Sequence, residues 1–364
     1  MHARLQKLKS CKWPPPKKFD RRSLDLIMNK NTNLLKSISK KEGNKNKNNI
    51  AWLFNRILYN RPLLLVAVII ILSVIMAIKF PLAFPQQANF AAILLDTAQG
   101  GILTVGMLVL LICGVFDLSA GNNMAISGIV AGTLVKFMGA PAFISILAGI
   151  LTGTLIGFLN GMIVTRLRIN ALITTLAMSG ILRGVTQMVS PSGIENLPQS
   201  IKPFGQTVIF GIQSPFWIMI IVVLIGWFLL SRVRYFRQFY YVGSNSKAAT
   251  LSGIKVPRLT VVGFALMGTM AGLAGTILAS RLSSAIVLAG NGVELRAITA
   301  ALMGGASLAG GVGTVPGIVL GVLFMSLIQN VLIMAKVPVY WQSVVVGLVL
   351  LVAIGIDQFG RSRK

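Results

Sequence analysis

Long apolar segments constrain this chain more than any other feature of its sequence. From residue 63 onward, runs of close to 20 mostly apolar residues recur, and this is the length that the hydrocarbon core of a bilayer requires of a helix. Only 12% of the 364 residues are charged, whereas a soluble domain carries roughly 25%. The alternating ten-residue strands of outer-membrane barrels are absent. We therefore expect an all-α, polytopic helical membrane protein.

The sequence predicts about ten transmembrane helices. The eighth is too short to cross a bilayer as one straight helix, so we expect a broken or tilted element there. A short interfacial helix is expected over 90–98, which would leave Asp96 ahead of the second span. The predicted spans are 63–79, 97–115, 121–138, 142–165, 171–188, 214–231, 259–280, 294–305, 314–335 and 340–356.

Basic residues predict the topology. Residues 1–62 hold 16 of the 34 Lys and Arg residues, and their Asn-, Lys- and Ser-rich composition is typical of a disordered tail. Loops assigned to the cytoplasm are also richer in Lys and Arg than the other loops, so both termini are expected there. We predict a cytoplasmic tail (1–62), a transmembrane domain (63–357) with a cytoplasmic loop at 232–258, and a second cytoplasmic tail (358–364).

The net charge of +26 suggests nucleic-acid binding, but the position of the charge favours another partner. Because the basic residues gather in a tail beside a membrane domain, contact with anionic lipid headgroups is the simpler interpretation. We therefore expect membrane lipids, and no nucleic acid, among the partners.

The sequence offers little for catalysis, metal binding or cofactor binding. The only histidine is His2, and Cys11 and Cys113 fall in the tail and in a predicted helix, so neither a metal site nor a disulfide is expected. The phosphate-binding pattern GxxxxGK[ST] is absent. We predict that the chain is not an enzyme and binds no cofactor. If such a membrane protein moves a solute without an ATPase site of its own, it must use an ion gradient, a passive pore or a partner ATPase.

Two features suggest how the helices are arranged. The stretch FDLSAGNNMAISGIVAGTLV (116–135) resembles ASLAGGVGTVPGIVLGVLF (306–324), and six spans separate the copies, which predicts two similar parallel bundles. Each copy begins with a glycine-containing helix break, and two facing breaks would outline a path; two ordinary loops at the cytoplasmic edge are the alternative. Glycines four residues apart at 149, 153, 157 and 161 predict close helix packing.

Polar residues near the first break form a candidate translocation path. An acidic side chain inside a membrane span costs about 2.5–3.5 kcal/mol on insertion scales, so it usually faces a partner or a cavity. Hydroxyl, amide and carboxylate groups suit an uncharged polyhydroxy solute, although Asp117 could instead cap the helix that begins near Gly121. The candidate path residues are Asp117, Ser119, Asn122 and Asn123.

The polar stretch YVGSNSKAATLSGIKV (241–256) lies between two long apolar segments. It contains no histidine, acid pair or phosphate-binding loop, so we interpret it as a docking surface for a separate motor protein. The candidate docking residues are Gly243, Asn245, Ala248, Ala249, Ser252, Gly253 and Ile254.

Three stretches resemble one known family. GVFDLSAG (114–121) resembles its motif G-x-D-L-S-V-G, with Ala120 in place of the usual valine, and INALITTLAMSGILRG (169–184) resembles its segment ending in Arg-Gly. GSNSKAATLSGIKV (243–256) fills every specified position of its cytoplasmic motif G-x-N-x-x-A-A-x-x-S-G-I-x-V. The family is the ribose-type sugar permease of ATP-binding-cassette importers, and the resemblance covers roughly residues 60–360.

The resemblance implies a permease subunit in the bacterial inner membrane. It implies a second permease subunit, identical or closely related, and a cytoplasmic ATPase that docks on the 243–254 motif and hydrolyses the ATP. It also implies an external solute-binding protein that delivers a monosaccharide. A nucleoside, a branched-chain amino acid or a signalling sugar derivative remains an alternative solute, and an ion-coupled secondary carrier using Asp96, Asp117 or Glu294 remains an alternative mechanism.

Overall fold

The structure is a computed structural model that describes residues 61–361. The predicted tail over 1–62 therefore lies almost wholly outside the described residues, as does the end of the predicted 358–364 tail. The elements are α3 (Arg61–Lys79), α4 (Gln87–Ile112), α5 (Ala120–Phe137), α6 (Ala142–Arg166), α7 (Ala171–Val189), α8 (Pro203–Gln206), β1 (Val208–Ile209), β2 (Ile212–Gln213), α9 (Ser214–Arg232), α10 (Arg234–Ser244), α11 (Ser246–Leu251), α12 (Val256–Leu282), α13 (Val293–Met303), α14 (Val315–Met334) and α15 (Val339–Arg361).

Each of the ten predicted spans corresponds to a helix, so the all-α membrane fold is confirmed. Seven of the described helices are long and apolar enough to cross a membrane by length and composition, namely α3, α4, α6, α7, α9, α12 and α14. The eighth predicted span is α13, which has only 11 residues. It follows an irregular connection from α12, as expected for a broken element.

The prediction of a separate interfacial helix over 90–98 is wrong. Those residues belong to α4, which runs unbroken for 26 residues from Gln87. Pro85 lies just ahead of this helix, and Ile93 in its first turns packs in an apolar cluster with Met76 and Leu327 of α3 and α14. Asp96 therefore lies inside a membrane-spanning helix.

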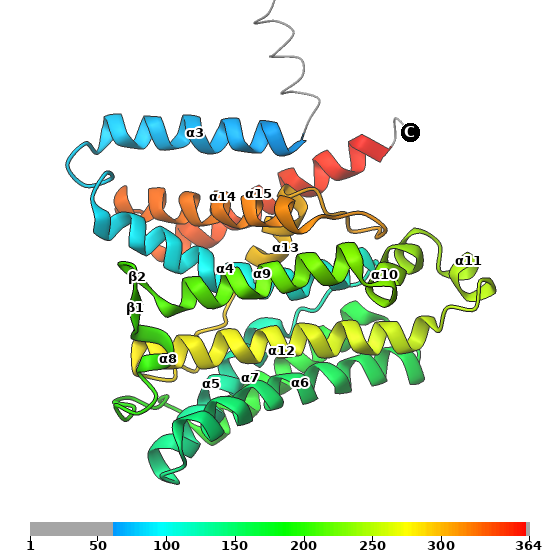
Figure 1. The fold of residues 1–364 in the computed structure, drawn as a ribbon, viewed down its shortest axis with the longest axis horizontal. Coiled ribbons are helices and arrows are strands. Elements are labelled where there is room, and N and C mark those ends of the chain that lie inside the picture. The colour runs from blue at the N-terminus through cyan, green and yellow to red at the C-terminus, as the bar shows by residue number, and fades with distance from the viewer. Residues whose placement is uncertain (1–60, 362–364) are drawn as a thin grey trace, which may run out of the picture. The chain divides into compact units, whose positions relative to one another are not determined.

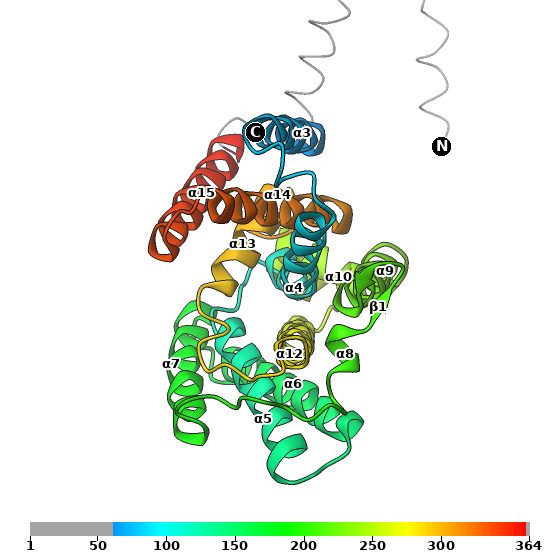
Figure 2. The ribbon, with the colours of Figure 1, turned by 90° about the vertical axis from the view of Figure 1, so that its left-hand side faces the viewer.

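Helices α4 and α12 lie at the centre of the bundle, with the other long helices around them (Figure 2). Every residue of α4 from Gly101 to Ile112 is buried. The predicted glycine stripe faces α12: a Cβ added at Gly153 would lie 2.4 Å from the carbonyl oxygen of Gly268, and one at Gly157 would lie 2.2 Å from that of Phe264. The two backbones approach this closely because the glycines have no side chains.

The two sequence copies do not form separate bundles. Because six spans separate the similar stretches, the repeat unit that contains the first stretch begins at α3 and the one that contains the second begins at α12, and these two helices run in the same direction (Figure 1). Helix α12 of the second copy nevertheless packs against α5 and α6 of the first, while α4 of the first packs against α13 and α14 of the second. The two helix breaks also meet, because the Gly311 amide donates to the Ile112 carbonyl oxygen at 2.8 Å.

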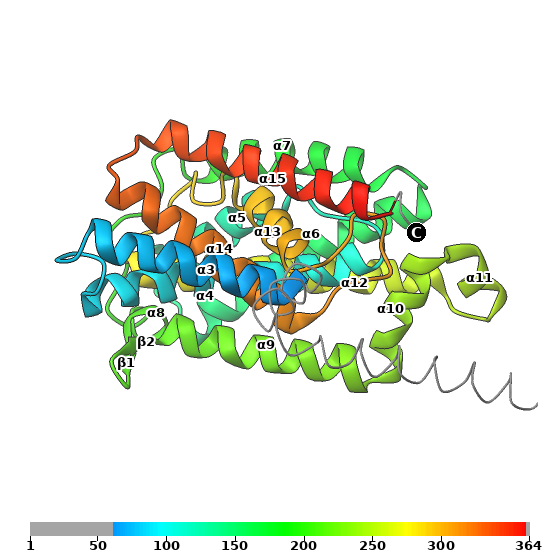
Figure 3. The same cartoon turned by 90° about the horizontal axis from the view of Figure 1, so that it is seen from above.

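The two ends of the bundle differ in structure. Helices α10 and α11 lie at the end that also holds the C-terminal end of α15, whereas α8 and the short β1–β2 hairpin lie at the opposite end (Figures 1 and 3). In the hairpin, Val208 pairs with Gln213 and Ile209 with Ile212.

Candidate functional site

The 243–256 motif forms a short helix with a cap at each end. Asn245 precedes α11, and its side-chain oxygen accepts a hydrogen bond from the Ala248 amide at 3.0 Å, which is an N-cap. At the other end Gly253 has a φ of 81°. Its amide donates to Thr250 O and the Ile254 amide donates to Ala249 O, both at 3.0 Å, which is a Schellman motif. The motif's Asn and Gly are therefore explained by local structure.

The capped helix presents two different faces. Ala249 is 4% exposed and belongs to the main apolar core, against which Ile254 also packs. Ala248, Ser252 and Lys247 are exposed, and Leu251 is 90% exposed. Helix α11 projects from the end of the bundle (Figure 3). The outer face could therefore contact another protein without disturbing the core.

Gly243 joins this motif to both helix breaks. A Cβ added at Gly243 would lie 1.7 Å from the Ile112 carbonyl oxygen and 2.5 Å from the Gly311 nitrogen. Nearby, the Tyr240 hydroxyl donates to Gly313 O at 2.9 Å. Burial raises the pKa of the Tyr240 phenol above its usual value, so the phenol keeps its proton and remains a donor. Helix α10 thus contacts the end of α4 and the loop that leads into α14.

Asp117 and Ser119 lie together in a fully buried polar cluster. Asp117 Oδ1 accepts hydrogen bonds from the Ser119 amide at 2.7 Å and from its hydroxyl at 2.6 Å. The Asn160 side-chain amide donates to Ser119 Oγ at 2.9 Å. Helix α5 begins at Ala120, the residue after Ser119. Asp117 therefore forms a turn just before this helix and does not bond to the amides of the first helical turn. Asp117 Oδ2 and Asn160 Oδ1 have no hydrogen-bond partner among the described residues.

Asn122 and Asn123 face other helices. The Asn122 side-chain amide donates to the hydroxyl of Ser179 on α7 at 2.7 Å. The Asn123 side-chain amide donates to the Gly153 carbonyl oxygen on α6 at 3.1 Å. Two of the four predicted path residues therefore hold α5 against its neighbours, and their role in a translocation path stays a prediction.

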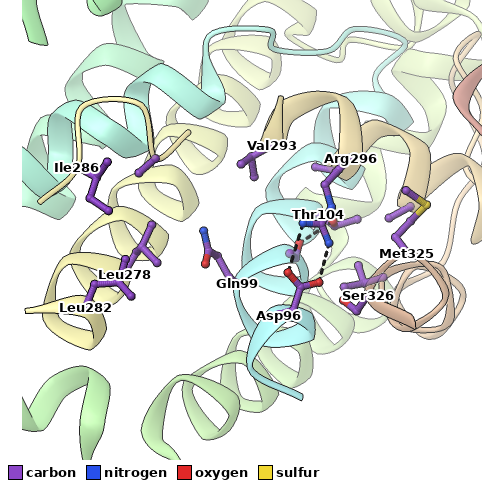
Figure 4. Close-up of a pocket in the computed structure, with 15 residues that line it drawn as sticks. Asp96, Gln99, Thr104, Leu278, Leu282, Ile286, Val293, Arg296, Met325 and Ser326 are labelled. Atoms are coloured by element: carbon purple, nitrogen blue, oxygen red, sulfur yellow. Dashed lines mark hydrogen bonds and ion pairs between the residues drawn. The ribbon is translucent and has the colours of Figure 1, made fainter. Parts of the chain in front are cut away.

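A cavity of about 290 Å³ lies elsewhere, between α4, α12, α13 and α14 (Figure 4). Within it, Arg296 of α13 forms a two-pronged ion pair with Asp96 of α4, with distances of 2.6 Å and 3.3 Å from its two terminal nitrogens to the two carboxylate oxygens. None of the four predicted path residues lines it. The residues that line it are Asp96, Gln99, Gly100, Thr104, Leu278, Leu282, Ile286, Ala289, Val293, Arg296, Ala297, Ala300, Val322, Met325 and Ser326.

The sequence places Asp96 ahead of the second predicted span and gives no partner for it, so its pairing with Arg296 is found only in the structure. The two residues are 200 positions apart, so no local spacing relates them. The available signal was that both are charged residues in largely apolar segments, and such charges usually pair with one another or face a cavity.

These observations define a class of protein: a polytopic α-helical membrane protein with a cavity of polar and apolar walls between its helices and a capped helix projecting at one end. The family described as "Branched-chain amino acid transport system / permease component" matches residues 89–354. The chain belongs to this family of ATP-binding-cassette transporter permease components, which are not enzymes.

Curated relatives cover most of the chain. The ribose import permease protein RbsC of Escherichia coli K12 is 36% identical over 298 residues, which are 80% of this chain and 92% of the relative. The L-arabinose ABC transporter permease protein AraH of Azospirillum brasilense is 34% identical over 301 residues, 82% of this chain and 88% of the relative. RbsC of Bacillus subtilis 168 is 38% identical over 292 residues, which are 79% of this chain and 90% of the relative. No solved structure matches the chain.

Proposed function

We propose that this chain is the permease subunit of an importer for a monosaccharide, and that a separate ATPase drives it by docking on the outer face of α11. The observation that carries the docking role is the position of Leu251, a large apolar side chain that is 90% exposed on a capped, projecting helix. A solvent-exposed apolar side chain on a rigid element is a suitable anchor for a partner's pocket. Ala248 and Ser252 lie on the same exposed surface.

The proposal includes the topology and the other partners. The ATPase is cytoplasmic, so the end that carries α10, α11 and the C-terminal end of α15 faces the cytoplasm, and the basic 1–62 tail lies along anionic lipids of the bacterial inner membrane. Arg234, Arg237, Lys247 and Lys255 at that end support the orientation. A second permease subunit completes the membrane unit, and an external binding protein delivers the solute to the opposite end.

The solute is proposed from the relatives, whose names specify ribose and L-arabinose. Uptake into proteoliposomes of the complete transporter, with labelled ribose, L-arabinose, leucine and adenosine compared, tests this choice. ATP-dependent uptake of a sugar is expected. Uptake driven by a proton or sodium gradient in the absence of ATPase and nucleotide would instead establish a secondary carrier.

The docking role is tested by the variant Leu251→Asp. Because anchor residues of interfaces typically contribute 2 kcal/mol or more, the variant is expected to weaken ATPase association by about 30-fold or more. The measurement is the amount of ATPase that co-purifies with the permease.

Phe210→Asp is the matched control, because Phe210 is 91% exposed in the hairpin at the opposite end of the bundle. It should retain the ATPase. Equal retention of the ATPase by both variants would contradict docking on α11.

A further inference from the structure

The cavity between α4, α12, α13 and α14 combines a polar wall with an apolar wall. Asp96, Arg296, Gln99 and Ser326 provide carboxylate, guanidinium, amide and hydroxyl groups, while Leu278, Leu282 and Ile286 provide the aliphatic side (Figure 4). Its volume of about 290 Å³ corresponds to roughly ten water molecules at about 30 Å³ each. A monosaccharide has about that number of non-hydrogen atoms.

Two of the polar groups have hydrogen-bonding capacity that the described residues do not use. Ser326 Oγ is buried and has no hydrogen-bond partner in the described part of the chain, and it does not bond to a carbonyl of the preceding helical turn. A buried hydroxyl without a partner is unfavourable, and because Ser326 lines the cavity, a turn of its side chain would offer this hydroxyl to a ligand. Among the described residues, the side-chain amide of Gln99 donates only to the Met124 sulfur, at 3.7 Å, which is a weak acceptor.

The ion pair remains accessible from the cavity. The side chains of Arg296 and Asp96 are 26% and 34% exposed. A guanidinium has five N–H donors, and the pair uses two of them, so others can reach a bound hydroxyl without breaking the pair. The two charges cancel, which leaves the site without net charge.

We propose that this cavity is a solute-binding site within the permease, specific for a neutral polyhydroxy solute of monosaccharide size. The inference rests on the proposed transport function and adds the residues that hold the solute. The Asp96 carboxylate accepts from one solute hydroxyl and the Arg296 guanidinium donates to a neighbouring one. Ser326 Oγ and the Gln99 side chain bind further hydroxyls.

The ion pair between Asp96 and Arg296 also selects against other solutes. A zwitterionic amino acid would need Arg296 for its carboxylate and Asp96 for its ammonium group, and would have to split an ion pair that is closed at 2.6 Å. A polyol uses the groups that the pair leaves free. None of the residues that line the cavity is aromatic, so the site lacks the stacking surface of a tight sugar-binding site. Weak binding suits a path that must also release its solute.

The variant Ser326→Ala tests the site, with Thr174→Val as the matched control. Thr174 Oγ1 on α7 is the other buried hydroxyl oxygen that lacks a partner among the described residues, and it does not line the cavity. Both substitutions remove an unused hydroxyl, so neither should lower the thermal midpoint of the purified complex. Gln99→Leu is a second cavity variant, which keeps the test decisive if Ser326→Ala fails to fold.

Two readouts are needed: saturation-transfer NMR of ribose with the nanodisc-embedded transporter, and ATP-dependent ribose uptake at saturating binding protein. Because one hydrogen bond is removed, Ser326→Ala should weaken ribose binding about three- to tenfold and slow uptake, while Thr174→Val matches the wild type. Wild-type values for Ser326→Ala and Gln99→Leu in both readouts would overturn the site. Saturation transfer to leucine but not to ribose would overturn its specificity.

The failure of this inference is distinguishable from failure of the proposed function. If the wild-type transporter takes up ribose with ATP and the cavity variants do so equally well, only the cavity assignment is wrong. If the wild type shows no ATP-dependent uptake of any solute, the transport proposal is wrong, and with it the role of the cavity.

Discussion

Replacement of Gly243 by alanine is expected to disturb the contact between α10 and the two helix breaks. The new Cβ would lie 1.7 Å from the Ile112 carbonyl oxygen and 2.5 Å from the Gly311 nitrogen, whereas real Cβ contacts are essentially never below 3.0 Å. Helix α10 must therefore move by at least about 1.3 Å, because both opposing atoms belong to backbone. Such a movement would also stretch the 2.9 Å hydrogen bond from Tyr240 to Gly313.

The expected cost combines two effects. Overpacking in a closely packed site typically costs about 1–3 kcal/mol. A weakened hydrogen bond at Tyr240 adds about 1 kcal/mol. We therefore expect Gly243→Ala to lower the free energy of unfolding by about 2–4 kcal/mol and to reduce the amount of solute taken up per ATP hydrolysed.

Gly180→Ala is the control for this prediction. Gly180 lies in helix α7, where an added Cβ would meet nothing within 4 Å, so alanine should stabilise the helix by up to about 1 kcal/mol. The measurements are the denaturation midpoint of the detergent-purified permease and the ratio of uptake to ATP hydrolysis in proteoliposomes. Equal midpoints and equal ratios for the two variants would refute the reasoning from Gly243.

Two further substitutions follow from the same packing and burial. Gly157→Ala would place a Cβ 2.2 Å from the Phe264 carbonyl oxygen and force α6 away from α12, so we expect a loss of about 1–3 kcal/mol in unfolding free energy, measured by thermal denaturation. Gly184→Ala is the control, because its Cβ meets nothing within 4 Å and the variant should be neutral or stabilising. Ala249→Asp would bury a carboxylate in the core and lower the denaturation midpoint of the protein. Ala248 is exposed, so Ala248→Asp should keep the wild-type midpoint and lose only the ATPase in co-purification. Equal midpoints for the two variants would contradict the assigned faces of α11.

The helices and the close packing of α6 against α12 could be predicted from the sequence because both depend on local patterns. Bilayer thickness determines the length of an apolar run, and the four-residue spacing from Gly149 to Gly161 places the glycines on one helix face. The start of α4 was predicted wrongly, since the polar residues around Asp96 lower the apolarity of its first turns. In the structure Asp96 is satisfied by Arg296, a partner that hydropathy does not detect.

The candidate site could be predicted only where its contacts join residues close together in the sequence. The caps at Asn245 and Gly253 are readable from the motif, because each residue serves a conformation within a few positions. The cavity is built from four helices, and its ion pair joins residues 200 positions apart, so only tertiary packing reveals it. The sequence predicts Asp117 as a path residue because it is an acid near a membrane span, but its hydrogen bonds are made mainly with Ser119, two residues away.

Helix α4 connects the proposed docking surface with the proposed solute site. Asp96 lies in its first half and Ile112 is its last residue, so at 1.5 Å per residue the two are about 24 Å apart along one continuous helix. At the Ile112 end the carbonyl oxygen contacts both Gly243 of α10 and the Gly311 amide in the loop before α14, and α14 carries Ser326 into the cavity. Because α4 is buried from Gly101 to Ile112, bending it there would disrupt core packing. A displacement of α10 by a docked ATPase would therefore shift α4 and α14 as bodies, and with them Asp96 and Ser326 in the polar wall of the cavity.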